Sequence, residues 1–357
     1  MNRKKSFASL LKITCVMVCS CIGTQFVWAD KTDSESITDT AMGTDCSVRV
    51  YGSDRTAKDI MDMLSDIENK YLSWRIEGSD IANINENASE NKPVMPSKWT
   101  YGYLENVLDL ARESSGAFDP TLGRVSQLWN LESDNPYIPS KSELTELLLE
   151  TGWEKISLGD GEVFLKDGVQ IDLGAVGKGI GCDEARKMLE ETGADAAVVS
   201  VGGSILTYGK KPDGKPWKIG IANPRNEDGE SYLGSLTIDG TCSISTSGDY
   251  EKYVIEDGVR YHHILDTKTG YPAENGRADC SACTGRGITV TIVCDDGWLS
   301  DGLSTACFVL GYEDSLSLLE TYQAEAVFVT EDKEVIVTDG LKDMFTLTDS
   351  SYEQVEE

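Results

Sequence analysis

Positive charge is scarce in this sequence. Its 357 residues carry 32 Lys and Arg against 61 Asp and Glu, which gives a formal net charge of -29 at pH 7. Such a field argues against nucleic acid and against an anionic membrane surface as partners. A phosphate-bearing ligand is compatible with it if a local site, such as one that holds a divalent cation, offsets the repulsion.

Histidine is nearly absent, and its two copies, His262 and His263, are adjacent. Imidazole is the side chain best suited to move a proton near neutral pH, so such chemistry is expected in the stretch 246–272 that contains them. The stretch is rich in hydroxyls and ends in Gly270-Tyr-Pro, which is typical of strand, loop and strand. From the pair alone, a hydrogen-bonded or exposed histidine without chemistry remains the alternative.

The apolar run near the N-terminus, Leu10–Ile22, is too short for a comfortable membrane crossing. It follows a basic start at residues 3–5, so it predicts an export signal. Cleavage after Ala29 would release a mature chain, whereas cleavage before Cys21 would give a lipoprotein acylated on that cysteine. Both alternatives place the mature protein outside the cytoplasm, at the outer face of the membrane if the lipid is present.

The ten cysteines do not form the pattern of a small disulfide scaffold. Cys15, Cys19 and, in one alternative, Cys21 leave with the signal, and the seven that remain are an odd number. Cys280-Ser-Ala-Cys283 could be a redox pair or half of a metal site. No second C-x-x-C and no histidine lie near it in sequence, so a local disulfide or two idle thiols is the favoured interpretation.

Regular alternation of strands and helices is also lacking, as are internal repeats and interdomain linkers, so we predict one α+β domain over 42–350. A polar, acidic tether (30–41) precedes it and an acidic tail (351–357) follows. The apolar periodicities predict helices at 57–71, 99–114, 140–151, 180–192, 301–310 and 314–322, strands at 46–51, 196–201, 217–221, 231–238 and 288–293, and hairpins at 163–173 (turning at 166–168) and 326–338.

Neither G-x-G-x-x-G nor a Walker loop occurs, but two weaker patterns suit phosphate chemistry. Gly174–Gly179 lies between a strand and a helix, where it could cradle a phosphate or simply make a tight turn. Asp301 and Thr305 are four residues apart at a helix start, so their oxygens share a face that suits Mg²⁺. A helix cap with its neighbour is the alternative for this pair.

The order of the motifs is more specific than any one of them. Met42-Gly-Thr, Leu72-Ser-Trp, Gly116-Ala-Phe-Asp-Pro, Asp172-Leu-Gly-Ala-Val-Gly-Lys-Gly, Ser245-Thr-Ser-Gly-Asp-Tyr, His263-Ile-Leu-Asp-Thr-Lys-Thr-Gly-Tyr-Pro and Asp301-Gly-Leu-Ser-Thr follow one another. This series resembles the ApbE family, the FAD:protein FMN transferases, over roughly residues 40–350.

The resemblance implies a two-part α+β fold, related to the T-fold, with FAD in the cleft between the parts. It implies Mg²⁺-dependent transfer of FMN from FAD to a Thr or Ser hydroxyl of a flavoprotein, with release of AMP. By motif position it assigns His263 as the catalytic base, and it assigns the metal to Ala175 (through its carbonyl), Asp301, Ser304 and Thr305. The residues that it assigns to FAD are Met42, Trp74, Ala117, Phe118, Asp119, Asp172, Lys178 and Ile264.

The sequence departs from the family pattern at a few positions. Thr267 stands where the family usually has Pro, Trp74 is matched across a one-residue difference in length, and 277–287 extend a loop. The implied acceptor is a flavoprotein subunit of a membrane redox complex or an exported FMN-binding-domain protein, which agrees with an export signal. Hydrolysis of FAD to FMN and AMP, and flavin binding without turnover, are the competing functions.

Overall fold

The computed structural model describes residues 34–355, apart from 54–55, 132, 134, 167, 226–231 and 275–286. Within these ranges the α-helices are α1 (Thr56–Ile67), α2 (Asp80–Asn87), α3 (Lys98–Glu113), α4 (Gly123–Trp129), α5 (Lys141–Leu148), α6 (Gly177–Thr192), α7 (Gly297–Leu310) and α8 (Tyr312–Tyr322). One π-helical turn, Glu68–Leu72, extends α1, and short 3₁₀ turns lie at Trp153–Lys155 and Asp339–Leu341. None of the described helices is long and apolar enough to cross a membrane.

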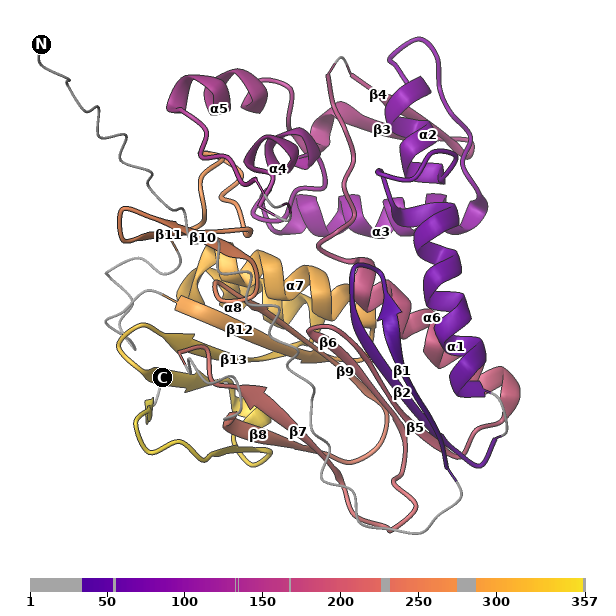
Figure 1. Cartoon of the computed structure of the whole chain (residues 1–357), viewed down its shortest axis with the longest axis vertical. Coiled ribbons are helices and arrows are strands. Elements are labelled where there is room, and N and C mark those ends of the chain that lie inside the picture. The colour runs from indigo at the N-terminus through magenta and orange to yellow at the C-terminus, as the bar shows by residue number, and fades with distance from the viewer. Residues whose placement is uncertain are drawn as a thin grey trace, which may run out of the picture.

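Nine of the described strands form one sheet in the order β1-β2-β5-β6-β9-β12-β13-β14-β16, and all neighbours are antiparallel except β14 and β16 (Figure 1). They are β1 (Ser34–Ala41), β2 (Thr44–Tyr51), β5 (Ala196–Val201), β6 (Ser204–Gly209), β9 (Cys242–Gly248), β12 (Gly287–Cys294), β13 (Glu325–Thr330), β14 (Glu334–Val337) and β16 (Glu353–Val355). The smaller sheets contain β7 (Trp217–Ala222), β8 (Tyr232–Ile238) and β15 (Phe345–Leu347), the hairpin β3 (Ile156–Gly159) and β4 (Glu162–Leu165), and the hairpin β10 (Tyr253–Glu256) and β11 (Val259–His262).

The inner strands of the large sheet are buried on both faces, which explains why β5 reads as a continuous apolar run. Side chains alternate across a strand, so Val198 packs among β7 and β8 residues while Val199 packs among α1 and α6 residues. Helices α6 and α7 thus cover one face, and the three-stranded sheet covers the other. The α+β prediction is confirmed.

Helices α6 and α7 cross through two glycines. A Cβ on Gly179 would lie 2.0 Å from the carbonyl oxygen of Gly297, and a Cβ on Gly297 would lie 2.3 Å from that of Gly179. Contacts this short exclude any side chain at the crossing, so the two helices approach backbone to backbone. The crossing brings the first turn of α6 against the first two turns of α7.

A buried carboxylate of α6 caps α7. Asp183 accepts hydrogen bonds from the backbone N–H groups of Gly297 (2.6 Å) and Trp298 (2.8 Å). This cap explains why α7 begins at Gly297, four residues before the position predicted from the sequence. Burial nevertheless raises the pKa of Asp183 from 3.8 to about 6.

The raised pKa of Asp183 predicts a pH-dependent stability. The folded state favours the protonated form of Asp183. The stability that this side chain contributes is therefore complete below pH 4 and is lost as the pH rises through 6. We expect the free energy of unfolding of the wild type, minus that of Asp183→Asn, to fall by on the order of 3 kcal/mol between pH 4 and pH 7. Denaturant titrations of both proteins at each pH measure this difference, and a difference independent of pH would contradict the prediction.

The second part of the molecule contains α2 to α5 and the β3–β4 hairpin, which lie above the large sheet in Figure 1. Trp129 of α4 is buried, and its indole N–H donates to the carbonyl of Gly270 at 2.8 Å. The ring also contacts Tyr261 and Tyr271, with centroids 5.7 and 5.9 Å away. These contacts join the helical part to the stretch that carries the two histidines.

The predicted disordered tether is wrong for residues 34–41. This segment is β1, which pairs with β2 along its whole length from Ser34 opposite Tyr51 to Ala41 opposite Thr44. Its polar and acidic composition predicts a tether. Antiparallel pairing with β2 nevertheless satisfies its backbone hydrogen bonds, and its position at the edge of the sheet leaves most of its side chains exposed. The remainder of the tether and the export signal lie outside the described residues.

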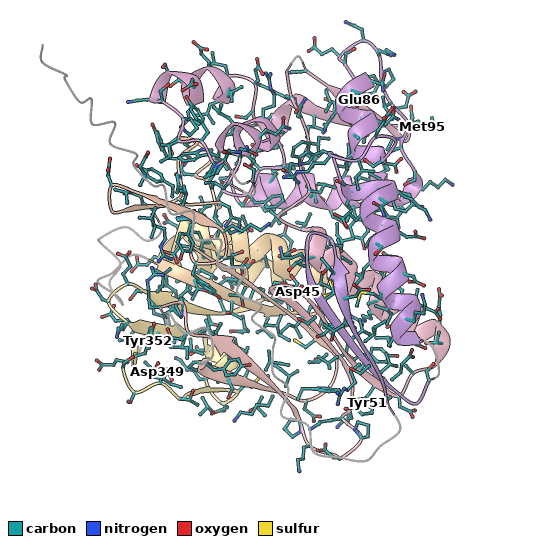
Figure 2. The ribbon with its side chains drawn as sticks, viewed as in Figure 1. Asp45, Tyr51, Glu86, Met95, Asp349 and Tyr352 are labelled. Atoms are coloured by element: carbon teal, nitrogen blue, oxygen red, sulfur yellow. The ribbon has the colours of Figure 1, made fainter. Side chains whose placement is uncertain are left out.

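Two further expectations need correction. The hairpin predicted to turn at 166–168 turns instead at Asp160 and Gly161, both with positive φ, between β3 and β4. The predicted acidic tail contributes β16, which is held by nearby side chains: Asn223 donates to Asp349 at 2.7 Å, and Tyr352 donates to Asn223 at 2.9 Å. Figure 2 shows Asp349 and Tyr352 close together at this end of the molecule.

Candidate active site

The α6–α7 crossing places a cation and a carboxylate together. The carboxylate of Asp301 on α7 is almost fully buried; one of its oxygens lies 3.3 Å from the Lys178 ammonium, and the other accepts from the backbone N–H of Gly179 at 3.0 Å. Burial alone would lower the pKa of Lys178, but the carboxylates of Asp301 and Glu251 raise it overall. Lys178 is therefore a protonated ammonium that remains partly open to solvent.

Hydroxyl groups lie next to Asp301 on the same helix. Ser304 is fully buried and donates to the backbone carbonyl of Asp301 at 2.8 Å, while Thr305 is partly exposed. Ser247 of β9 lies 2.7 Å from the Ser304 hydroxyl and 3.4 Å from that of Thr305. A carboxylate surrounded by hydroxyls, with Ala175 in the turn just before α6, is a set of hard oxygen ligands of the kind that Mg²⁺ takes.

Glu251 is a carboxylate of this site that the sequence did not single out. It lies against the turn between β5 and β6, where a Cβ on Gly203 would be 3.1 Å from its Oε1. Burial raises its pKa, and the charge of Lys178 opposes that rise. Its position directly after Gly248-Asp-Tyr250 was the only available signal.

His263 follows β11 at the base of the β10–β11 hairpin. Its backbone N–H donates to the carbonyl of Lys252 at 3.0 Å, and its Nδ1 lies 3.3 Å from the same oxygen. A carbonyl can only accept, so Nδ1 carries the proton and Nε2 keeps a lone pair. Burial, with the charges of Lys252 and Lys178 nearby, lowers the pKa of His263 to about 3, so the imidazole is neutral at pH 7.

His262 has a different environment from His263. It is buried, its Nε2 donates to the carbonyl of Ala273 at 3.2 Å, and its ring packs edge-on against Phe308. Its Nδ1 is buried and lacks a hydrogen-bond partner among the described residues. His262 thus belongs to the core, whereas His263 is only partly buried and is affected by the charge of Lys178.

A partly buried ion pair holds the loop that leads to His263. Arg225 donates to both oxygens of Asp249 at 2.8 Å each, and Arg260 approaches the same carboxylate at 3.7 Å. The guanidinium of Arg260 also lies 4.1 Å from the ring of Tyr253. The pairing fixes both the Ser-Gly-Asp-Tyr loop and the hairpin after it, because a bidentate pair has a defined geometry.

Three loops assigned to FAD are joined by hydrogen bonds. Asp172 donates its backbone N–H to Pro120 at 2.8 Å, and Thr267 donates its hydroxyl to the carbonyl of Gly116 at 2.6 Å. Thr267 is the position where the family usually has Pro, and here its hydroxyl ties the histidine loop to the Gly116 loop. Ala117, Phe118 and Ile264 are buried in the same region.

Two of the assigned carboxylates already have internal partners. Asp119 accepts from the backbone N–H and hydroxyl of Thr121 (2.8 and 2.6 Å) and from the N–H of Trp153 (3.1 Å). Asp172 accepts from the N–H of Gly174 at 2.8 Å. Burial raises the pKa of Asp119. Both carboxylates therefore shape their loops, whatever they contact in a ligand.

Met42 lies against the first turns of α6, and Trp74 packs against the same hydrophobic core. Met42, with φ of 54°, donates its backbone N–H to Glu68 at 2.8 Å, and its Cε lies 3.8 Å from where a Cβ on Gly177 would be. The indole nitrogen of Trp74 is buried without a hydrogen-bond partner in the described part of the chain. An unpaired buried donor is costly, so it fits a polar ligand such as the flavin nucleotide.

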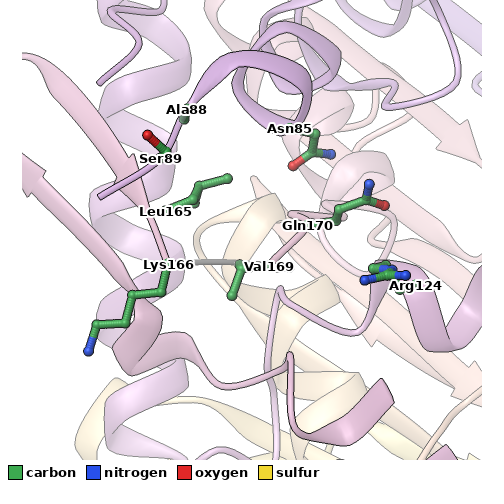
Figure 3. Close-up of a pocket in the computed structure, with 9 residues that line it drawn as sticks. Asn85, Ala88, Ser89, Arg124, Leu165, Lys166, Val169 and Gln170 are labelled. Carbon is green, nitrogen blue, oxygen red and sulfur yellow. The ribbon is translucent and has the colours of Figure 1, made fainter. Parts of the chain in front are cut away.

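A separate cavity of about 180 Å³ lies in the helical part, lined by Asn85, Arg124, Lys166 and Gln170 among others (Figure 3). Its polar groups are already bonded: Arg124 pairs with Glu150, Gln170 accepts from Gln127, and Asn85 bonds to the backbone of Ile171. It contains none of the predicted site residues. The candidate active site is therefore the region around Lys178, Asp301 and His263.

The fold and this arrangement define an α+β protein with a lysine–carboxylate pair at a helix crossing, and comparison with known proteins identifies the family. The ApbE family model matches residues 42–328, and the chain belongs to the ApbE family, as predicted. An FAD:protein FMN transferase of Treponema pallidum is 33% identical over 87% of this chain and 88% of its own length, and one of Klebsiella pneumoniae is 29% identical over 88% and 95%.

Solved structures agree with this assignment. The ApbE protein of Thermotoga maritima superimposes with a TM-score of 0.77 at 31% identity, over 87% of this chain and 99% of its own. The flavin transferase ApbE of Vibrio cholerae gives 0.73 at 26% identity, over 90% and 99%.

Five cysteines lie in the described part of the chain. The described cysteines Cys46, Cys182, Cys242, Cys294 and Cys307 are free thiols. Burial raises the pKa of each of them, so none is a reactive thiolate at neutral pH. Cys21, Cys280 and Cys283 lie outside the described residues.

Proposed function

We propose that this protein transfers FMN from FAD to a Thr or Ser hydroxyl of an acceptor flavoprotein. The acceptor oxygen attacks the FMN-side phosphorus, the bond from that phosphorus to the bridging oxygen breaks, and AMP leaves. The proton of the acceptor hydroxyl moves to the enzyme, and FMN remains attached to the acceptor oxygen through a phosphoester bond. The observation that carries the proposal is a lysine–aspartate pair at the α6–α7 crossing together with a neutral imidazole at His263, in a chain whose relatives are named FAD:protein FMN transferases.

His263 is proposed to accept the proton of the acceptor hydroxyl. Its Nδ1 is used by the Lys252 carbonyl, so Nε2 is the basic nitrogen. The lowered pKa makes the imidazole a weak base, but it keeps the ring in its unprotonated form over the working pH range. Lys178 offers positive charge to the pyrophosphate, which the acidic surface of the protein would otherwise repel.

Mg²⁺ is proposed to bind at Asp301 and Thr305, with Ala175 contributing its carbonyl and Ser304 lying beneath. When bound, the ion neutralises charge on the phosphates. Asp301 would hold it by a buried carboxylate whose geometry is fixed by Gly179 and Lys178. Met42, Trp74, Ala117, Phe118, Asp119, Asp172 and Ile264 are proposed to form the FAD site.

The acceptor is proposed to be an exported flavoprotein or a membrane redox subunit, because residues 3–29 have the pattern of an export signal. Mass spectrometry of an acceptor peptide incubated with the protein, FAD and Mg²⁺ tests the activity. An added FMN mass supports the transferase. AMP and free FMN with an unmodified peptide would support the hydrolase, and retained FAD without AMP would support a binding protein.

Substitution of the buried carboxylate tests the metal proposal. We expect Asp301→Asn to lower FMN transfer at least ~100-fold at 1 mM Mg²⁺, since a bound metal ion contributes several kcal/mol of charge stabilisation. A matched control is Asp183→Asn, which removes another buried carboxylate from the same helix crossing without touching Lys178. Equal activity of the two variants would contradict the assignment of Asp301.

A further inference from the structure

Strand β9 presents a ladder of serines to α7. Ser243, Ser245 and Ser247 alternate along the strand, so they share the face that α7 covers, and all three are buried. Ser245 lies 2.7 Å from the Ser300 hydroxyl, and Ser247 lies 2.7 Å from that of Ser304. Hydroxyls are thus paired at a sheet–helix interface that is usually apolar.

The spacing of the serines along β9 matches their spacing along α7 because of backbone geometry. Two strand residues advance by about 6.6 Å and four helix residues by about 6 Å, so serines at i and i+2 on a strand meet serines at i and i+4 on a helix. The same match places Thr305 within 3.4 Å of Ser247. In the described structure, Ser245 has Ser204 as its other hydroxyl partner, at 3.0 Å.

The direction of the hydrogen bonds around Ser247 follows from counting protons. Ser304 uses its only hydroxyl proton on the carbonyl of Asp301, which cannot donate. Ser304 must therefore accept a hydrogen bond from Ser247. The hydroxyl of Ser247 has one proton, and this bond uses it. Thr305 must then be the donor in its contact with Ser247.

We infer that Ser247 is a positioning residue for the metal site, because it takes the hydroxyl proton of Thr305 and leaves the lone pairs of that oxygen free for the cation. The inference rests on the proposed Mg²⁺ site. The order Thr305, Ser247, Ser304, Asp301 carbonyl makes a one-way chain of hydrogen bonds that begins and ends at residues of that site. Partners that orient metal ligands in this way commonly change metal affinity 10–100-fold when removed.

Ser245 provides a matched control. It is on the same strand and face, is also buried, and is bonded to a serine of α7 at the same distance. Its hydrogen bonds lead to Ser204 and Ser300 and not to Thr305. Ser245→Ala and Ser247→Ala therefore remove similar interface bonds, and only the second disturbs the proposed ligand.

The test is calorimetric titration of Mg²⁺ alone, and of Mg²⁺ in the presence of FAD, into the full chain. We expect Ser247→Ala to raise the Mg²⁺ dissociation constant 10–100-fold and Ser245→Ala to change it less than twofold. Thermal unfolding without Mg²⁺ should show similar losses for both variants. Ser247→Ala should also shift the Mg²⁺ concentration for half-maximal transfer, with rates that recover at high Mg²⁺.

Two further variants separate the possible failures. If Asp301→Asn leaves Mg²⁺ binding unchanged, the proposed metal site is wrong. If Asp301→Asn abolishes binding but Ser247→Ala behaves like Ser245→Ala, the site stands and the role of Ser247 is overturned. Thr305→Val should weaken binding, and Ser247→Ala should add nothing in that background, since the serine acts through the threonine; additive losses would overturn the inference.

Discussion

Replacement of His263 by Ala is expected to lower FMN transfer by about 10²–10⁴-fold, the usual contribution of general base catalysis. FAD and Mg²⁺ affinities should change little, because the base acts on the acceptor hydroxyl. Mass spectrometry of the acceptor peptide gives the rate, and equilibrium titration of FAD gives the binding. The low pKa of His263 adds a second expectation: transfer should show no histidine-dependent loss between pH 8 and pH 6, because the active neutral form persists below that range.

His262→Gln is the companion control. This neighbour is buried against Phe308 and bonded to Ala273, so the substitution should lower stability and leave the rate of transfer per folded molecule within a few-fold of the wild type. If His262→Gln lowered the rate of transfer and His263→Ala did not, the base would be His262. A residual rate above one tenth in His263→Ala would show that positioning alone accounts for the reaction.

Gly179→Ala is expected to cost about 3 kcal/mol or more of the free energy of unfolding, because the new methyl would overlap the Gly297 carbonyl at 2.0 Å. Backbone cannot rotate away as a flexible side chain can, so α6 and α7 must separate. The separation would also displace Lys178 from Asp301. Denaturant unfolding measures the loss, and activity should fall even where the variant remains folded.

Gly102→Ala is the matched helical substitution. Gly102 lies in α3 with nothing within 4 Å of the position of its missing Cβ, so Ala should stabilise the helix by about 0.5–1 kcal/mol. Opposite signs at the two positions are the expected result. Equal, small effects at both would mean that the α6–α7 crossing relaxes more easily than its backbone contact suggests.

Much of the fold follows from local patterns. The helical stripes of α1, α3 and α8 and the apolar runs of β5 and β12 are each strong enough to predict their elements within a few residues. Strand β1 is not predicted from its sequence, which is polar and acidic, because its strand conformation depends on pairing with β2 and on contacts with α1. The start of α7 cannot be predicted from local sequence because the residue that caps it, Asp183, is 114 residues away in the chain.

The site was predictable only as an ordered set of motifs. Spacing alone left Asp301 and Thr305 as a possible helix cap and the histidines as a possible structural pair. The environments of His262 and His263 differ through Ala273, Phe308 and the Lys252 carbonyl, none of which the sequence places beside them. Ser247 and Glu251 lie in or next to the Ser245-Thr-Ser-Gly-Asp-Tyr motif, but their contacts depend on how β9 meets α7 and on the turn after β5, which the sequence does not show.

The contact between Lys178 and Asp301 joins positions 123 residues apart. A chain emerging from its N-terminus would complete α6 and the loops that contain Phe118 and Asp172 long before α7 exists, and α7 can dock only after β9 and β12 have closed the centre of the sheet. Long-range closure of this kind is slow. The proposed cation site therefore depends on long-range closure, so we expect it to assemble late in folding, after the loops proposed to bind the flavin.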